Sequence, residues 1–318
     1  MSTSPYTPSP MANVEPAAAL PPPEQNKFLF GPNGLRAGWR IAIFFLIFVA
    51  TSAALNFVLH HIPAWVAWGK SQPKDSPSPA FLFTLESMNT VVLLIVAFFM
   101  TLIEKRSFAD YYLPWNQAFA KRFWQGLPYG FAMLSLLIGI IAALHCFSID
   151  GIATSGATAV KYGLLYGLGF LAVGMFEEFG FRGYLLSTLS SGIGFWWAAI
   201  IMSLLFGGAH IQNGGESWFG AVMAGTFGLL ASFALYRTGN LWFPIGMHAA
   251  WDWGETYFYG VADSGLKPIG NLLASTSHGN HWISGGSVGP EGSIFALVVL
   301  AIGAVGIHFL FPTKQITD

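Results

Sequence analysis

The sequence has few charged residues. Asp, Glu, Lys and Arg together make up 9% of its 318 residues, whereas a soluble domain carries about 25%. Hydrophobic residues make up 54%, so polar side chains are too few to cover a globule that faces water. We therefore predict an all-α, polytopic membrane protein whose main surroundings are a lipid bilayer.

Cysteine and net charge are also low. The single cysteine, Cys146, excludes an internal disulfide and a cysteine-based metal cluster. The formal net charge of −1 gives no reason to expect a nucleic-acid partner. The N-terminal segment lacks both the basic start and the apolar core of a signal peptide. Because it is rich in Pro, Ala and Ser, we expect a disordered cytosolic tail over residues 1–35 and a membrane domain over residues 36–318.

Long apolar runs predict about eight transmembrane helices, each of which needs ~20 mostly apolar residues. The expected segments are residues 37–60, 80–103, 124–146, 160–182, 194–211, 218–237, 241–259 and 292–311. With the N-terminus in the cytoplasm, ten of the 14 Lys and Arg residues lie at the inner ends of these segments. This asymmetry predicts a multi-pass protein of the cell (inner) membrane with both termini cytoplasmic.

Three ionisable residues, Glu177, Glu178 and Arg182, lie at the end of the fourth apolar segment. Charge inside a membrane segment is costly, and by default it indicates a functional site. Arg182 follows Glu178 by one helical turn and shares its face, so we expect these two to pair. Glu177 points in another direction and could face a cavity as a general base. The alternative is a structural ion cluster that ties two helices together.

Two histidines in other apolar segments could complete an intramembrane polar site. His210 follows Phe206 by four residues, and the glycines between them allow close approach of another helix. His248 and Asp252 are also one turn apart, so the carboxylate either orients the imidazole or shares a cavity with it. Taken alone, His210 would fit a buried histidine bonded to a carbonyl. Together with the glutamates, these residues indicate a lined cavity.

The three motifs resemble those of a known family. Glu177-Glu178-x-x-x-Arg182, Phe206-x-x-x-His210 and His248-x-x-x-Asp252 occur in this order in separate apolar segments. This arrangement is similar to the CAAX-processing and bacteriocin-processing (CPBP) intramembrane proteases, whose bacterial members are often called Abi proteins. The resemblance covers roughly residues 120–310 and implies a CAAX protease-like hydrolase with a site deep in the bilayer. Its substrates would be membrane-associated peptides or proteins.

The resemblance also implies roles for the motif residues. Glu177 would activate water, and His210 would assist it or hold a metal. His248 and Asp252 would complete the site and stabilise the developing oxyanion. An ionised Asp252 cannot donate a hydrogen bond to an oxyanion, so it would have to be protonated, bind metal or orient His248. Glu178 and Arg182 complete the predicted catalytic set.

Metal dependence stays open at the level of sequence. The family is usually described as metalloproteases, and His210, His248 and one Glu would match a three-ligand zinc site with an open position. Water activated by Glu177 and His210 without metal is also chemically coherent. Two other functions could use the same residues: a proton-coupled transporter, or a catalytically silent immunity or scaffold protein of the same fold. Transporters often carry an inverted repeat, and we see none in the sequence.

Overall fold

The computed structural model describes residues 26–31, 34–213, 215–313 and 315–316. The chain divides after Arg36 into two compact units. In the first unit, β1 (Phe30–Gly31) and β2 (Gly34–Leu35) pair as a short antiparallel hairpin. Residues 1–25, most of the tail expected to be disordered, lie outside the described residues.

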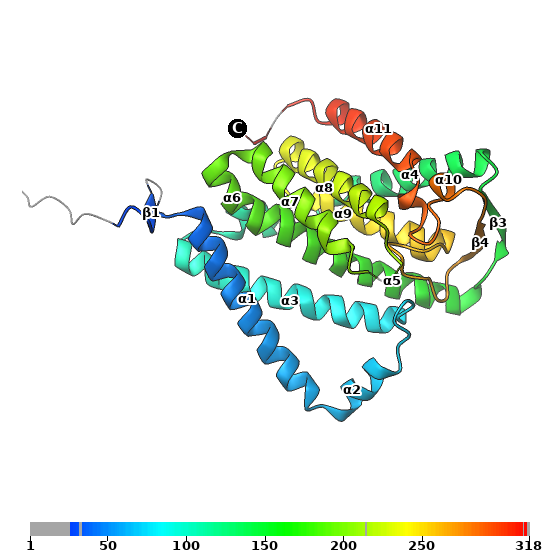
Figure 1. Cartoon of the computed structure of the whole chain (residues 1–318), viewed down its shortest axis with the longest axis horizontal. Coiled ribbons are helices and arrows are strands. Elements are labelled where there is room, and N and C mark those ends of the chain that lie inside the picture. The colour runs from blue at the N-terminus through cyan, green and yellow to red at the C-terminus, as the bar shows by residue number, and fades with distance from the viewer. Residues whose placement is uncertain (1–25, 32–33, 214, 314, 317–318) are drawn as a thin grey trace, which may run out of the picture. The chain divides into compact units, whose positions relative to one another are not determined.

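The second unit consists of helices (Figure 1). Its long helices are α1 (Ala37–His60), α3 (Pro79–Glu104), α4 (Lys121–Ala143), the continuous helix of α5 (Gly156–Glu177), η3 (Glu178–Leu185) and α6 (Leu186–Ile193), and α8 (Trp218–Thr238). The shorter ones are α7 (Phe195–His210), α9 (Trp242–Asp252) with its continuation η4 (Trp253–Tyr259), and α11 (Phe295–Leu310). Within the described residues, all eight expected apolar segments are helical, and the all-α polytopic fold is confirmed.

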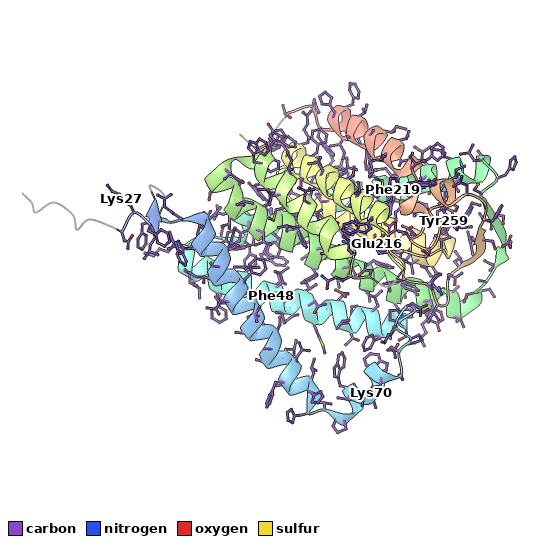
Figure 2. All side chains as sticks on the ribbon, viewed as in Figure 1. Lys27, Phe48, Lys70, Glu216, Phe219 and Tyr259 are labelled. Atoms are coloured by element: carbon purple, nitrogen blue, oxygen red, sulfur yellow. The ribbon has the colours of Figure 1, made fainter. Side chains whose placement is uncertain are left out.

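The outer surface of these helices is apolar. By length and composition, five of the described helices can cross a membrane. On α1 the one buried residue is Phe44, while Leu46 and Phe57 are exposed. Figure 2 shows side chains projecting from the outside of the helices. Apolar surface on this scale requires an apolar solvent, so the chain is an integral membrane protein.

Shorter elements connect the long helices. A second antiparallel sheet pairs β3 (Phe147–Ile152) with β4 (Leu273–Ser277). The sequence did not indicate this sheet, because its strands come from distant loops and leave no local hairpin signal. The remaining elements are α2 (Pro63–Lys70), η1 (Phe108–Tyr111), η2 (Trp115–Gln117), α10 (His281–Ser284) and η5 (Pro290–Gly292).

The centre of the second unit is α9, in which every residue is buried. Helix α4 packs closely along α9. The two backbones are so near that a Cβ added at Gly130 of α4 would overlap the Met247 carbonyl of α9. Gly246 makes the reciprocal close approach to the backbone of α4. Small residues let helix backbones come this near in membrane proteins. The glycine contacts therefore fix the position of α9, which carries His248 and Asp252.

The helix that carries Glu177 continues well past the motif. It runs without interruption from Gly156 to Ile193, so Glu177 lies near its middle. The segment expected from the sequence covers residues 160–182, and the helix extends beyond both of its ends. The helix changes to π geometry directly after Glu177, and α9 does so directly after Asp252. Such π-helical segments are frequent at functional sites.

Candidate active site

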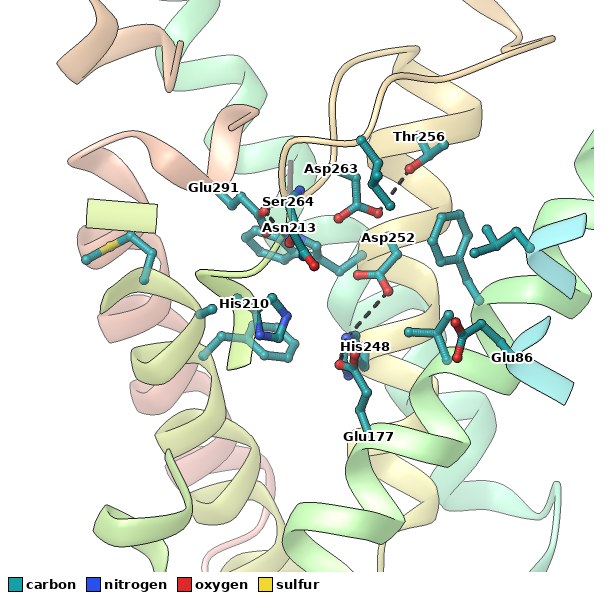
Figure 3. Close-up of a pocket in the computed structure, with 18 of the residues that line it drawn as sticks. Glu86, Glu177, His210, Asn213, His248, Asp252, Thr256, Asp263, Ser264 and Glu291 are labelled. Atoms are coloured by element: carbon teal, nitrogen blue, oxygen red, sulfur yellow. Dashed lines mark hydrogen bonds and ion pairs between the residues drawn. The ribbon is translucent and has the colours of Figure 1, made fainter. Parts of the chain in front are cut away.

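Residues of all three motifs line one cavity of about 200 Å³. Glu177 enters it from α5, His210 from α7, and His248 and Asp252 from α9 (Figure 3). In Figure 3, His210 and Glu177 lie on different sides of the space, with His248 and Asp252 between α9 and the cavity. The structure thus brings together four of the predicted site residues from three separate segments.

His248 is held between carboxylates. Its Nδ1 lies 2.8 Å from Glu178 Oε1. Because an ionised carboxylate only accepts hydrogen bonds, Nδ1 carries a proton and donates it. The other ring nitrogen, Nε2, lies 3.4 Å from Asp252 Oδ2 and 3.6 Å from Glu177 Oε2. Both distances exceed those of a normal hydrogen bond, so Nε2 remains available to form a hydrogen bond with a group in the cavity.

Glu178 and Arg182 form an ion pair behind His248, as their spacing predicts. Arg182 Nη1 donates to Glu178 Oε1 over 3.2 Å, and both side chains have 0% exposure. The guanidinium carbon also lies 4.0 Å from the centroid of the Phe206 ring. The same Glu178 oxygen accepts from Arg182 and from His248, which creates a chain of three buried groups. The link to His248 joins two helices, so sequence spacing could not reveal it.

His210 presents one nitrogen to the cavity. Its Nδ1 lies 2.8 Å from the Phe206 carbonyl oxygen. A carbonyl only accepts, so Nδ1 carries a proton, and in the neutral imidazole Nε2 is then an acceptor. The ring also packs on the Phe206 ring, with 4.5 Å between the centroids. A carbonyl-bonded histidine suits a structural role, but His210 also lines the cavity with a basic nitrogen.

The two adjacent glutamates differ in exposure. The Glu177 side chain is 22% exposed and lines the cavity, whereas the Glu178 side chain is 0% exposed. Glu177 Oε2 is buried beside His248 and has no hydrogen-bond partner in the described part of the chain. The Glu177 side chain as a whole is therefore partly open to a molecule in the cavity, whereas Glu178 is fixed by protein groups.

Three further acids, which are not among the predicted site residues, line the cavity: Glu86 on α3, and Asp263 and Glu291 in the segment between η4 and α11. A single acid inside an apolar helix is the signal that could have identified Glu86. The Asn89 side chain donates a hydrogen bond to the Glu86 carboxylate over 3.3 Å. The other two acids belong to a stretch that reads as an ordinary loop, and it folds back against the cavity.

The two loop acids are in a poorly solvated place. Burial, followed by the charge of Asp263, raises the pKa of Glu291 to about 8. Burial, followed by the charge of Asp252, raises the pKa of Asp263 well above its usual range. Desolvation and neighbouring negative charge both disfavour the ionised form of a carboxyl group. In the described part of the chain, neither acid forms an ion pair with a Lys, Arg or His.

The donor atoms do not fit the zinc site that the resemblance implies. Zinc holds its nitrogen and oxygen ligands at about 2.0–2.2 Å, which places neighbouring donor atoms roughly 3.3 Å apart. Over the described ranges, the compact group of three His, Cys, Asp or Glu donors is Glu255, Asp263 and Glu291. Neither His210 nor His248 belongs to it. Zinc binding by the two histidines stays a prediction.

A family model described as Type II CAAX prenyl endopeptidase Rce1-like matches residues 159–254. The chain contains a CAAX protease-like region. The match begins in α5, ends in η4 and includes all six predicted catalytic residues. The family resemblance carried by the three motifs is thereby confirmed. No curated protein and no solved structure gives a significant match to the chain.

Proposed function

We propose that the protein is an intramembrane endopeptidase of the CAAX prenyl protease type, which hydrolyses a peptide bond of a membrane-associated substrate. The observation that carries this proposal is that Glu177, His210, His248 and Asp252 from three helices line one cavity. Hydrolysis within a bilayer needs a place where water and polar groups are shielded from lipid, and these side chains provide one.

In this reaction Glu177 is the general base. The Glu177 carboxylate, which lines the cavity, accepts a proton from a water molecule as the water oxygen attacks the peptide carbonyl carbon. His210 Nε2 provides a second acceptor that orients the water. When the tetrahedral intermediate collapses, the carbon–nitrogen bond breaks. The protonated Glu177 then returns its proton to the leaving amine nitrogen.

His248 is the group that we assign to the oxyanion. When both ring nitrogens are protonated, Nδ1 donates to Glu178 and Nε2 donates into the cavity. A donor that is already positioned for the developing charge is typically worth about 2.7–4 kcal/mol of transition-state stabilisation. Asp252 lies 3.4 Å from Nε2 and cannot donate when ionised, so we assign it the orientation of His248.

The cavity accommodates the part of a substrate around one peptide bond. Its volume of about 200 Å³ corresponds to roughly seven water molecules of ~30 Å³ each. Besides the polar groups, it is lined by apolar and aromatic side chains, which form its apolar wall and include Tyr166, Phe170 and Trp251. We propose that an apolar or prenylated end of the substrate lies along this wall, and prenylated peptides are the first substrates to test.

We further propose that both termini face the cytoplasm of the cell (inner) membrane. Arg40 at the start of α1 and Arg106 after α3 both pair with Glu104, over 2.9 and 3.6 Å. Arg122 near the start of α4 lies over the ring of Phe311, just after α11. Arginines thus gather at the end of the unit where the chain enters α1 and leaves α11, and the positive-inside rule places that end in the cytoplasm. The four Lys residues expected at the outer ends are Lys70, Lys74, Lys161 and Lys267.

The test is peptide cleavage by purified protein in liposomes. Fluorogenic peptides with and without a C-terminal prenylcysteine are compared at equal concentration. Glu177→Gln keeps the side-chain volume but removes the base, so we expect cleavage to fall by about 10²–10⁴-fold with unchanged thermal denaturation. Asp150→Asn is the matched control, because Asp150 is an exposed acid on β3 that does not line the cavity.

Near-wild-type cleavage by Glu177→Gln would rule out its role as the base. If the wild-type protein cleaves none of the peptides but conducts protons across the liposome membrane, the transporter hypothesis replaces the peptidase. If it does neither, the silent-scaffold hypothesis is favoured. The same preparation therefore separates all three functions that the motif residues allow.

A further inference from the structure

A compact cluster of acids lies beside the cavity, and the proposed reaction does not use it. One oxygen each of Glu255, Asp263 and Glu291 lies within 4.8 Å of the other two. Glu255 belongs to η4, the continuation of the helix that carries His248. The other two come from the segment between η4 and α11, and Figure 3 shows both on the far side of Asp252 from His248.

Each loop acid uses one carboxylate oxygen for a local hydrogen bond. Thr256 Oγ1 donates to Asp263 Oδ2 over 3.0 Å. Ser264 donates to Glu291 Oε1 from its backbone N and from its Oγ, over 2.6 and 2.8 Å. Among the described residues, no Lys, Arg or His forms an ion pair with any of the three acids. When these acids are ionised, no protein cation lies within ion-pair distance to balance their charge.

Glu255 is the acid in this cluster that points most directly to a bound ligand. It is 0% exposed, and neither of its carboxylate oxygens has a hydrogen-bond partner in the part of the chain that the structure describes. The Trp251 indole is near, but it does not reach hydrogen-bonding geometry. A buried carboxylate with no partner is strongly unfavourable, and proteins retain such a group when it is paired or holds a metal.

The loop backbone closes over the same carboxylate. Gly289 has a φ of 123°, and a Cβ at this position would overlap the Ala262 carbonyl oxygen and come within 2.8 Å of Glu255 Oε1. Only glycine readily adopts such a backbone and allows this approach. A backbone carbonyl oxygen thus lies close to the acids, and hard cations take carbonyl oxygens together with carboxylates as ligands.

We propose that Glu255, Asp263 and Glu291 bind one divalent cation through oxygen atoms. The cluster contains no nitrogen or sulfur donor, which favours a hard cation over zinc. Three carboxylates and a nearby carbonyl suit Ca²⁺, which takes six to eight oxygen ligands, better than Mg²⁺, which usually keeps several waters. The cation fastens the segment between η4 and α11 to the helix of His248 and so holds one wall of the cavity in place.

The test measures binding and stability and does not depend on peptide cleavage. Metal-depleted protein in detergent is titrated separately with Ca²⁺, Mg²⁺ and Mn²⁺, and bound metal and thermal denaturation are followed. We expect saturable binding of one ion per chain and, at a hundredfold excess over Kd, a rise in Tm of about 5–10 °C. Glu255→Gln should abolish both responses, and Asp150→Asn, an exposed acid outside the cluster, should keep them.

The variant itself should fold, because Glu255→Gln removes a buried negative charge. Its Tm without cation should equal or exceed that of the metal-depleted wild type. The proposal is overturned if none of the three ions binds the wild type saturably, or if binding survives the Glu255→Gln, Asp263→Asn double variant. Binding that is lost in Glu177→Gln but kept in Glu255→Gln would also overturn it, since the ion would then belong to the catalytic cavity.

Discussion

Replacing Arg182 with alanine tests the buried polar chain behind the cavity. The Arg182 and Glu178 side chains are both 0% exposed and are joined over 3.2 Å. Removing one partner of a buried ion pair costs about 3–5 kcal/mol, because the other charge remains in the interior. The guanidinium also lies over the Phe206 ring, a contact worth roughly 0.5–2 kcal/mol. We expect Arg182→Ala to lose stability and activity together.

The loss is large enough to measure. In a domain of this size, 1 kcal/mol shifts Tm by about 2–4 °C, so a cost of 3–5 kcal/mol corresponds to roughly 6–20 °C. Intrinsic tryptophan fluorescence in detergent reports the transition, at one fixed scan rate because unfolding is often irreversible. Lys267→Ala is the control, since Lys267 and Asp75 form a pair with 69% and 51% side-chain exposure. Exposed pairs contribute about 0–1 kcal/mol.

A second substitution identifies the cause of the loss. Adding Glu178→Gln to Arg182→Ala removes the unpaired charge and keeps an acceptor for His248, so part of the lost Tm should return. An Arg182→Ala protein as stable as the wild type would refute the reasoning. If that stable protein were also inactive, Arg182 would act on the substrate or the reaction, and its pairing with Glu178 would not be its main role.

Two further substitutions test how α9 is positioned and what Asp252 contributes. Gly130→Ala should cost about 1–3 kcal/mol of stability and reduce cleavage, because its Cβ would overlap the Met247 carbonyl. Gly139→Ala, where a Cβ would meet open space, is the control, and equal Tm values for the two variants would contradict the packing argument. Asp252→Asn should keep cleavage within about tenfold, because the amide can still contact His248 and can also donate to an oxyanion. A loss beyond ~10²-fold would mean that the ionised carboxylate is required.

The helices and the motif residues could be predicted because their signals are local. An apolar run of ~20 residues has few alternatives to a membrane helix. Within such runs, Glu177 and His248 are conspicuous because ionisable side chains are rare there. The pairing of Glu178 with Arg182 also follows from spacing along one helix. Each of these conclusions needs information from one segment only.

The contacts between segments could not be predicted in this way. The bond from His248 to Glu178 joins α9 to η3, and no spacing within either helix reveals it. Glu291 looks like an acid of an exposed loop until the chain is folded, and then it lines the cavity. The π geometry that begins at Glu178 and at Trp253 alters which side chains share a face, whereas spacing arguments assume a regular α-helix.

The acid cluster bears on the chemistry of the whole cavity. Glu177, Asp252, Asp263 and Glu291 all line it, and in Figure 3 Asp252 lies between Glu177 and Asp263, while Arg182 is already paired with Glu178. Attack of water on a peptide carbonyl creates a further negative charge, which such surroundings would oppose. A divalent cation at Glu255 would offset the acids without touching the reacting carbonyl. Metal found in the purified protein therefore supports metal catalysis only if it is lost with His210 or His248 and retained in Glu255→Gln.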